Sequence, residues 1–215
     1  MKLINDDCLN VMQYYTDNYF DLAIVDPPYG KKPHREGTYG SKGQYNKNKK
    51  SNFILENIQW DIKPNKNYFH ELFRISKYQI IWGMNYFIDC LTPTNSIIVW
   101  DKKTGNNVFA DCEIAWSNHK SNLKKFDYLW LGSHAHRHDK LIHPTQKPVA
   151  LYRWLLENYA KSTDKIIDTH LGSGSSAIAS HYFEIKEFVG IEINKEYYNN
   201  AVNRIKKETM QLKLI

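Results

Sequence analysis

Residues 165–177 read K-I-I-D-T-H-L-G-S-G-S-S-A, and the topology of the chain follows from this stretch. The apolar run Lys165–Asp168 predicts a strand that ends on a carboxylate. Gly172, Gly174 and Ala177 then follow the spacing G-x-G-x-x-G/A, and a helix is predicted to begin there. The two glycines allow a tight turn and a close approach of the backbone to a ligand. The stretch therefore predicts a strand–loop–helix nucleotide site.

An acidic residue, Glu192, closes the next predicted strand, 188–192, and lies 24 residues after Asp168 (192 minus 168). In nucleotide sites of this layout, the acid accepts hydrogen bonds from ribose hydroxyls. The pattern fits NAD, FAD or S-adenosylmethionine, and a turn that binds no ligand is the simpler alternative.

The glycine loop lies near the end of the chain, because only 41 residues follow Gly174 (215 minus 174). A dinucleotide-binding fold forms most of its sheet after this loop, so here the sheet must come from earlier residues, which disfavours a nicotinamide oxidoreductase. Apolar runs predict strands over 21–26, 78–82, 96–100, 112–116, 165–168 and 188–192. Helical spacing predicts helices over 68–77, from Pro148 onward, and over 175–182 and 197–207. We therefore expect an α/β fold: a circularly permuted Rossmann-like domain with a mostly parallel, twisted sheet flanked by helices.

A second carboxylate ends a strand near the N-terminus. The apolar run of residues 22–25 stops at Asp26, and Pro27, Pro28 and Tyr29 follow. Because proline fixes φ, the two prolines would hold the backbone beyond the carboxylate in one conformation. Taken alone, this tetrapeptide is also compatible with an ordinary turn at the end of a strand.

The length of 215 residues indicates one domain over residues 1–215. The sequence contains no run of about 18 apolar residues, so no transmembrane helix is expected. The N-terminus becomes acidic before any apolar segment develops, so no secretory signal is expected either. Cys8, Cys90 and Cys112 cannot all pair and show no C-x-x-C spacing, so we expect reduced thiols in a cytoplasmic protein.

The net charge of +6 is concentrated in one segment. Between residues 31 and 51, seven basic residues face Glu36 alone, and this balance of +6 leaves the rest of the chain formally neutral. Such a tract predicts a loop that meets nucleic acid, and a merely soluble loop is the alternative. We predict nucleic-acid contacts for these seven residues and for one arginine further along the chain: Lys31, Lys32, Arg35, Lys42, Lys47, Lys49, Lys50 and Arg137.

Together, these motifs resemble those of the beta class of DNA amino-methyltransferases, the permuted N6-adenine/N4-cytosine family with an Asp-Pro-Pro-Tyr motif. Asp26–Tyr29 matches that motif, and His143–Pro148 (H-P-T-Q-K-P) resembles the motif that flanks the cofactor. The resemblance spans about 5–204, with lapses over 31–64 and 117–142. The matching segments, in the order of that class, are 5–9, 26–29, 79–87, 98–102, 109–116, 143–148, 168–174 and 190–192. The composition of 31–52, rich in Gly, Asn, Ser and Lys, predicts a basic loop insertion there, and the resemblance implies a short target-recognition segment at about 117–142.

The resemblance implies S-adenosylmethionine as the cofactor, with S-adenosylhomocysteine as the product. Glu192 would hold its ribose, Asp7 its adenine amine, and Asp168 would lie near its methionine part. Thr145 and Lys147 would reach its carboxylate, although an exposed lysine at a helix start is the alternative for Lys147. The implied cofactor-binding residues are Asp7, Cys8, Asp26, Thr145, Lys147, Asp168, Leu171, Gly172, Ser173, Gly174, Glu192 and Ile193.

The activity implied is site-specific methyl transfer to the exocyclic N6 amine of an adenine flipped out of double-stranded DNA. Asp26, Pro27, Pro28 and Tyr29 are the implied catalytic residues. The carboxylate of Asp26 and the carbonyl of Pro27 would accept the two amine hydrogens, and the prolines would keep both acceptors in place. Tyr29 would offer a face on which the base stacks.

Three aromatic residues, Trp82, Phe109 and Trp116, are further candidates for the wall of the base pocket, with ordinary core packing as the alternative. Residues 134–138 read H-A-H-R-H. Neither a carboxylate nor a cysteine cluster completes a metal site there, and methyl transfer from a sulfonium needs no metal, so none is expected.

Two positions depart from the family pattern. The glycine loop begins with Asp followed by Thr169 and His170, where the family usually has Asp-Pro-Phe, and Asp6 stands where a glycine is usual. Neither change removes a carboxylate or a loop glycine that the chemistry uses.

The sequence leaves two alternatives to adenine transfer open. One is N4-cytosine transfer, although Asp before Pro-Pro-Tyr favours adenine because cytosine enzymes of this class commonly have Ser there. The other is a non-catalytic nucleic-acid-binding protein of the same fold. Small enzymes of this class often form dimers, so the resemblance also implies a homodimer, and we expect no membrane partner. The expected setting is the cytoplasm of a prokaryotic or phage-infected cell, within restriction–modification or phage biology.

Overall fold

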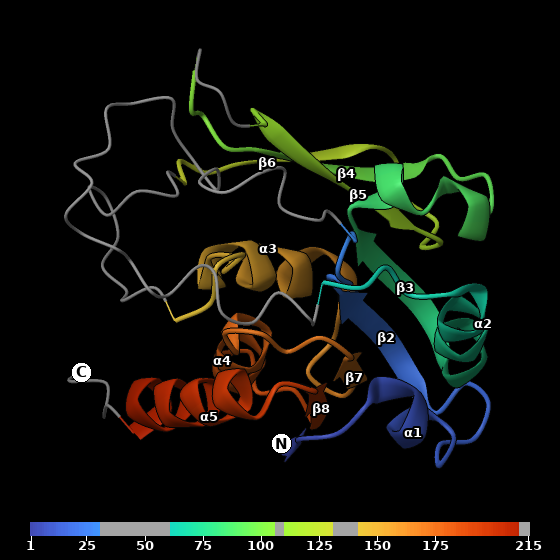
Figure 1. The fold of residues 1–215 in the computed structure, drawn as a ribbon. Coiled ribbons are helices and arrows are strands. Elements are labelled where there is room, and N and C mark those ends of the chain that lie inside the picture. Colours follow the sequence, from blue (N-terminus) through green and yellow to red (C-terminus); the bar gives the residue numbers. More distant parts are fainter. Residues whose placement is uncertain (31–60, 106–109, 131–141, 211–215) are drawn as a thin grey trace, which may run out of the picture.

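The computed structural model describes residues 1–30, 61–105, 110–130 and 142–210. Within these residues, one eight-stranded sheet runs through the centre of the molecule (Figure 1). Its strands are β1 (Lys2–Ile4), β2 (Phe20–Val25), β3 (Ser76–Trp82), β4 (Ser96–Asp101), β5 (Cys112–Ser117), β6 (Lys124–Asp127), β7 (Lys165–Asp168) and β8 (Glu187–Ile191). The order across the sheet is β1-β8-β7-β2-β3-β5-β4-β6.

Helices cover both faces of the sheet (Figure 1). One face carries α1 (Cys8–Met12) and α2 (Lys66–Ile75), and the other carries α3 (Val149–Tyr159), α4 (Ser175–Tyr182) and α5 (Lys195–Met210). Two short 3₁₀ turns, Met84–Tyr86 and Ile88–Cys90, follow β3. Each helical layer closes its own hydrophobic core against the sheet. The central strands are therefore buried on both faces, as expected for the parallel part of such a sheet.

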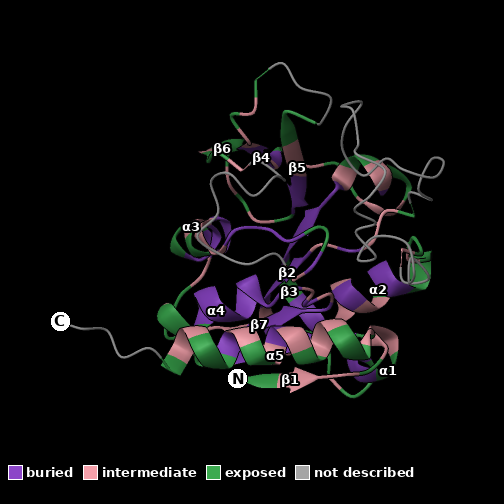
Figure 2. Cartoon of the chain, turned by 60° about the vertical axis from the view of Figure 1, so that its left-hand side comes forward, coloured by how far each residue is buried: buried purple, intermediate pink, exposed green. Residues whose placement is uncertain are grey.

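The helices form where the sequence gives them a start signal and an apolar stripe. The side chain of Asn65 accepts a hydrogen bond from the backbone N–H of Tyr68 and so caps α2. Pro148 directly precedes α3, where its fixed φ suits the helix start. On α5, Ala201 and Ile205 are buried four residues apart, and Figure 2 shows the exposed outer face of this helix.

Strand direction separates the sheet into two parts. The strands β1, β8, β7, β2 and β3 all run parallel to one another. Strand β5 is antiparallel to both of its neighbours, β3 and β4, and β6 then pairs in parallel with β4. The residues at the start of β5 therefore lie at the same edge of the sheet as the ends of β2, β3 and β7.

The chain reverses its progress across the sheet between β7 and β2. From β7 the chain passes through α4 on one face to β8 on one side, whereas from β2 it passes through α2 on the other face to β3 on the opposite side. Such a switch point leaves a crevice outside the carboxyl ends of the two strands, where ligands of open α/β sheets bind. The strands meet in register, with Leu22 opposite Ile166 and Ala23 opposite Ile167.

The predicted fold class, a permuted Rossmann-like sheet that is mostly parallel and flanked by helices, is confirmed. The predicted bounds of β7 and α4 agree with the structure, and those of the other predicted elements whose ends were given differ by one to three residues. Three short elements, β1, α1 and β6, were not predicted. The basic tract 31–52 and residues 131–141 lie outside the described residues, so the structure describes the proposed recognition segment only over 117–130 and at 142. In the part of the chain that the structure describes, no helix is long and apolar enough to cross a membrane.

Candidate active site

Three carboxylates stand at the carboxyl edge of the sheet. Asp26 follows β2 directly, Asp168 is the last residue of β7, and Glu192 follows β8 directly. Because β2, β7 and β8 are adjacent and parallel, their ends meet at this edge. The strand of the glycine loop thus lies beside the strand of Asp26, although Asp26 and Asp168 are 142 residues apart in sequence (168 minus 26).

Both carboxylate oxygens of Asp26 are engaged. Oδ1 accepts a hydrogen bond of 2.7 Å from the hydroxyl of Tyr29, and Oδ2 accepts one of 2.6 Å from Nζ of Lys147. Pro27, which directly follows Asp26, is buried. An incoming amine therefore meets a carboxylate whose orientation is already fixed, and it has to share or replace one of these donors.

The ring of Tyr29 packs closely against its surroundings. It stacks on Tyr86 with a centroid distance of 4.5 Å and an interplanar angle of 18°, and Phe87 meets it edge-on at 6.0 Å. Burial and the nearby charge of Asp26 raise the pKa of the Tyr29 hydroxyl well above its ordinary value. The ring of Tyr29 was expected to stack on a base, and one of its two faces is already covered by Tyr86.

Gly83 makes this position of Tyr29 possible. Its φ is +71°, and a Cβ atom added to it would lie 2.2 Å from Cε1 of Tyr29. That distance is far shorter than any carbon–carbon contact, so only glycine is compatible with the ring where it stands.

Trp82 and Trp116, proposed as walls of the base pocket, are core residues in this structure. Trp82 is fully buried and meets Trp100 edge-on at 6.4 Å. The indole N–H of Trp116 donates a hydrogen bond of 2.7 Å to the carbonyl of Thr92. The core-packing alternative is therefore the one that the structure supports for both. Phe109 lies outside the described residues.

Lys147 was expected at the cofactor carboxylate, or else in solvent at the start of a helix. The solvent alternative is wrong, because only 5% of its side chain is exposed. Its Nζ lies 2.6 Å from Oδ2 of Asp26 and 2.8 Å from Oε2 of Glu113. The charges of these two carboxylates outweigh the effect of burial and raise the pKa of Lys147. The lysine is therefore a fixed cation between two anions.

Glu113 was not predicted as a site residue from the sequence. It is the second residue of β5 in C-E-I-A-W-S, and the available signal was a carboxylate inside an otherwise apolar strand. Its Oε1 is 2.5 Å from Nζ of Lys102. The charges of Lys147 and Lys102 overcome the effect of burial and lower the pKa of Glu113 to about 2. Glu113 thus stays ionised and joins two lysines at this edge of the sheet.

The glycine loop has the conformation that its spacing predicts. Gly172 and Gly174 have φ values of +51° and +77°, in the left-handed region that favours glycine. The N–H of Gly172 donates a hydrogen bond of 2.9 Å to Oε2 of Glu192, and the N–H of Asn194 donates one of 2.8 Å to Oε1. Burial raises the pKa of Glu192. Each carboxylate oxygen keeps a second lone pair, so Glu192 can still accept hydroxyl hydrogen bonds.

Asp168 is almost completely buried beneath this loop. Its Oδ2 accepts a hydrogen bond of 2.5 Å from Oγ of Ser176, and its Oδ1 accepts one of 3.0 Å from the N–H of His170. Burial raises the pKa of Asp168 to about 7. Near neutral pH this carboxyl group is therefore divided between its neutral and charged forms, and a cation bound nearby would favour the charged form.

The unusual pair Thr169 and His170 has its own hydrogen-bond partners. The Thr169 hydroxyl lies 2.7 Å from the hydroxyl of Tyr68 on α2 and 2.9 Å from Nδ1 of His170. The His170 ring also meets Tyr68 edge-on at 5.3 Å, and burial lowers the pKa of His170 to about 4. The two polar residues thus tie the loop to α2, where the family usually has an apolar Pro-Phe pair.

The motif His143–Pro148 lies against the glycine loop. A Cβ atom added to Gly172 would be in ordinary contact with the His143 ring at 3.6 Å. Oγ of Ser175 donates a hydrogen bond of 2.7 Å to the carbonyl of Lys147. Thr145 is exposed and its hydroxyl lies 3.2 Å from Nδ1 of His143. Burial and the charge of Lys147 lower the pKa of His143 to about 4.

The N-terminal motif reaches the same edge through β1. The side-chain amide of Asn5 donates hydrogen bonds to the carbonyls of Glu192 at 2.7 Å and Ile193 at 3.1 Å. Asp7 caps α1, because its Oδ1 accepts a hydrogen bond from the N–H of Leu9. Burial raises the pKa of Cys8 to about 12, so its thiol stays protonated.

The structure places the remaining predicted residues as follows. Leu171 and Ser173 are buried in the glycine loop, whereas Ile193 is exposed beyond Glu192. The residues predicted to meet nucleic acid all lie outside the described residues: Lys31, Lys32, Arg35, Lys42, Lys47, Lys49, Lys50 and Arg137. The histidines of 134–138 lie there as well. Among the described residues, no group of three or more His, Cys, Asp or Glu could hold a metal ion.

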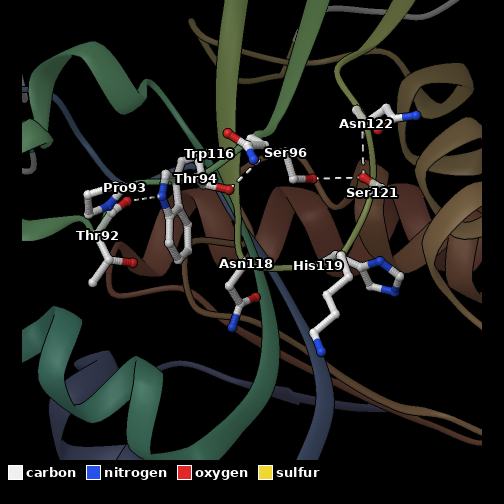
Figure 3. Close-up of a pocket in the computed structure, with 11 residues that line it drawn as sticks. Thr92, Pro93, Thr94, Ser96, Trp116, Asn118, His119, Ser121 and Asn122 are labelled. Carbon is white, nitrogen blue, oxygen red and sulfur yellow. Dashed lines mark hydrogen bonds between the residues drawn. The ribbon is translucent and has the colours of Figure 1, made fainter.

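A separate hollow of about 470 Å³ lies at the opposite edge of the sheet, where β4 begins and β5 ends (Figure 3). Its walls are mostly polar, and they include Thr94, Asn118 and His119. None of the three carboxylates of the switch point lines it. The hollow is therefore remote from the ends of β2 and β7.

Fold and site together define an α/β protein of the nucleotide-binding type, with a glycine loop and a strand-end carboxylate on neighbouring strands. A family model described as DNA methylase, the N6/N4 methylase family, matches residues 45–203, which is more than half of the chain. The chain belongs to this DNA methylase family. The family named from the sequence motifs is thus confirmed.

The similarity of this chain to individual methyltransferases, in sequence and in structure, supports this family assignment. The chain is 26% identical to the Type II methyltransferase M.HpaI of Haemophilus parainfluenzae over 251 aligned positions, which cover 96% of the chain and 74% of the relative. It shares its fold with the crystal structure of the M1.HpyAVI–SAM complex, with a TM-score of 0.60, 18% identity and coverage of 98% and 99% of the two chains. It also shares it with the cytosine-N4-specific PvuII DNA methyltransferase, with a TM-score of 0.59, 12% identity and coverage of 99% and 87%.

We predict that Gly83→Ala lowers the free energy of unfolding by about 2–4 kcal/mol, because it adds left-handed backbone strain to a collision with Tyr29. Urea denaturation would measure the loss. In a Tyr29→Ala background the collision is absent, so the same substitution should cost only about 1–2 kcal/mol. An equal loss in both backgrounds would show that Gly83 does not hold the place of the Tyr29 ring.

Proposed function

We propose that this chain is a DNA methyltransferase that uses S-adenosylmethionine and methylates the N6 amine of an adenine flipped out of double-stranded DNA. The observation that carries the proposal is the adjacency of Asp26, at the end of β2, to the glycine loop that follows β7. The first site presents a fixed acceptor, and the second is a nucleotide site. The family membership and the cofactor in the M1.HpyAVI–SAM complex support it.

The residues at the carboxyl edge fit this cofactor. The left-handed Gly172 and Gly174 leave room for a ligand close to the backbone. Glu192 retains acceptor capacity for ribose hydroxyls, and the buried Asp168 can balance a cation. We propose that Asp7, Cys8, Leu171, Ser173, Thr145 and Ile193 complete the site.

When bound, S-adenosylmethionine would supply a methyl group on a sulfonium: the amine nitrogen would bond to the methyl carbon, the bond from that carbon to sulfur would break, and the amine would lose a proton. An amine conjugated to a purine ring is a weak nucleophile, because its lone pair is delocalised. Asp26 can accept one N–H bond of that amine, and the carbonyl of Pro27 is our choice for the other. Accepting both bonds turns the lone pair toward the methyl group, and fixed acceptors avoid the cost of reorganisation. Asp26 is also placed to receive the proton.

Adenine is favoured over cytosine by one residue, the aspartate that precedes Pro27. The fold does not separate the two bases, because the cytosine-N4-specific PvuII enzyme shares it. N4-cytosine transfer therefore stays the second candidate, and a DNA-binding protein without catalysis is the third.

We further propose that residues 1–215 form one domain whose contacts with DNA come from two segments, 31–52 and 117–142. The seven basic residues of the first segment would meet phosphates, and Arg137 would do so in the second. A homodimer and a cytoplasmic location remain predictions.

We predict that methyl-labelled S-adenosylmethionine labels duplex DNA, and that nucleoside mass spectrometry of the product finds N6-methyladenine. Asp26→Ala should lower the rate at least about 100-fold, since it removes a preorganised acceptor, and circular dichroism should show that the fold is intact. Label recovered as N4-methylcytosine would assign the second candidate. A duplex that acquires no label would contradict methyl transfer and leave the third candidate, a DNA-binding protein without catalysis.

We also predict that cofactor binding shifts the carboxyl group of Asp168 toward its ionised form. With a pKa of about 7 in the ligand-free protein, this group is protonated below that pH, and a bound cation favours its ionised form. Binding should then release up to one proton near pH 6, and affinity should fall as the pH drops below about 7. Calorimetry in buffers of different ionisation enthalpy measures the release.

The matched control for this prediction is Asp168→Asn, which cannot ionise. The pKa values of His143 and His170 are about 4, so neither histidine titrates between pH 6 and 8. A proton release that is unchanged in the asparagine variant would assign the effect to another group.

A further inference from the structure

We propose that Glu113 is a positioning residue for the target amine: it holds the ammonium of Lys147 on Oδ2 of Asp26, so that Lys147 serves the amine side of the site rather than the cofactor carboxylate. This inference rests on the proposed methyl transfer and assigns a role within it. Neither Glu113 nor this use of Lys147 follows from the sequence motifs.

The contacts form a chain of four charges. From Asp26 the chain passes to Lys147 at 2.6 Å, to Glu113 at 2.8 Å and to Lys102 at 2.5 Å. Lys147 is the most buried member, with 5% of its side chain exposed, against 15% for Asp26, 24% for Glu113 and 17% for Lys102. Two anions and two cations balance, so the network can be buried without a net charge.

Each member is held by a different part of the fold. Glu113 is on β5, opposite Trp100 on β4, and the antiparallel course of β5 brings it to the carboxyl edge. Lys102 directly follows β4. The backbone of Lys147 is fixed by the hydrogen bond from Ser175, and its ammonium lies 5.7 Å from the centre of the Trp82 ring. Lys147 therefore cannot move toward another anion without breaking two ion pairs.

The network has a consequence for Asp26. Because Lys147 occupies Oδ2, the carboxylate is held against rotation, and Oδ1 is the oxygen left for the substrate. Among the described residues, the hydroxyl of Tyr29 is the hydrogen-bond donor to Oδ1. A neutral residue at position 113 would leave Lys147 with Asp26 as its one anionic partner among the described residues. It would loosen this orientation, with no direct effect on the glycine loop.

The test compares Glu113→Gln and Lys147→Met with the parent, using single-turnover methyl transfer to duplex DNA and calorimetric binding of S-adenosylhomocysteine. We expect both variants to lose about 10- to 100-fold in the transfer rate at saturating cofactor and DNA, with a cofactor Kd within about twofold of the parent. The matched control is Glu71→Gln, which removes an ion-paired glutamate of α2 that bonds to Arg74, and it should change neither quantity.

A second variant separates positioning from folding. Removing one partner of a buried pair can unfold a protein, whereas replacing both partners by uncharged residues of similar size is often tolerated. The double variant Glu113→Gln/Lys147→Met removes one charge of each sign and keeps the network neutral, so it should melt above either single variant without recovering the rate.

The outcomes are distinct. A full transfer rate in Glu113→Gln, or a double variant that regains the rate, would overturn the inference. A cofactor Kd that rises tenfold while the rate is unchanged would return Lys147 to the cofactor carboxylate. A parent protein that transfers no methyl group would instead contradict the proposed function, and this inference with it.

Discussion

Strand β2 pairs in parallel with strand β7, and the arrangement of the site follows from this pairing. It joins residues 22–23 to residues 166–167 across most of the chain. Because the two strands run in the same direction, the carboxylate after β2 and the glycine loop after β7 open at one edge. Their connections leave on opposite faces of the sheet, as at the switch points where open α/β sheets bind their ligands. The permutation changes the order of the motifs along the chain and leaves this adjacency intact.

The carboxylates at this edge differ in their electrostatic surroundings. Asp26 is neutralised by Lys147 in a network whose other members, Glu113 and Lys102, bring one more charge of each sign. Asp168 is buried with neutral partners, and its pKa rises to about 7. A fixed, charge-balanced acceptor suits a neutral amine, whereas a carboxyl group that ionises on demand suits a cation. Under the proposed function, the first of these carboxylates would meet the neutral amine and the second would face the sulfonium side of the cofactor.

Much of this arrangement could be predicted from the sequence, because the elements involved are local. The strand β7 and the helix α4 follow from an apolar run and a glycine spacing, and their predicted bounds agree with the structure. The elements β1 and α1, with three and five residues, are too short to show a period. The polar edge strand β6 shows no apolar alternation and forms by pairing with β4.

The roles of Lys147 and Glu113 needed the structure. A lysine before a helix start is usually exposed, and a single glutamate in a strand carries no motif. Their pairing depends on β5 running antiparallel to β3 and β4, which local sequence does not specify. Likewise, the sequence indicated that Tyr29 could offer a face to a base but not that it stacks on Tyr86, which depends on the close approach that Gly83 permits.

The most direct test of the account is a crystal structure of this chain with S-adenosylhomocysteine. We predict that the ligand lies across the carboxyl ends of β7 and β8, with its ribose hydroxyls on Glu192, while Lys147 stays on Asp26 and Glu113. A ligand bound elsewhere, such as in the hollow at the opposite edge, or one whose carboxylate takes Lys147 away from Asp26, would contradict the account.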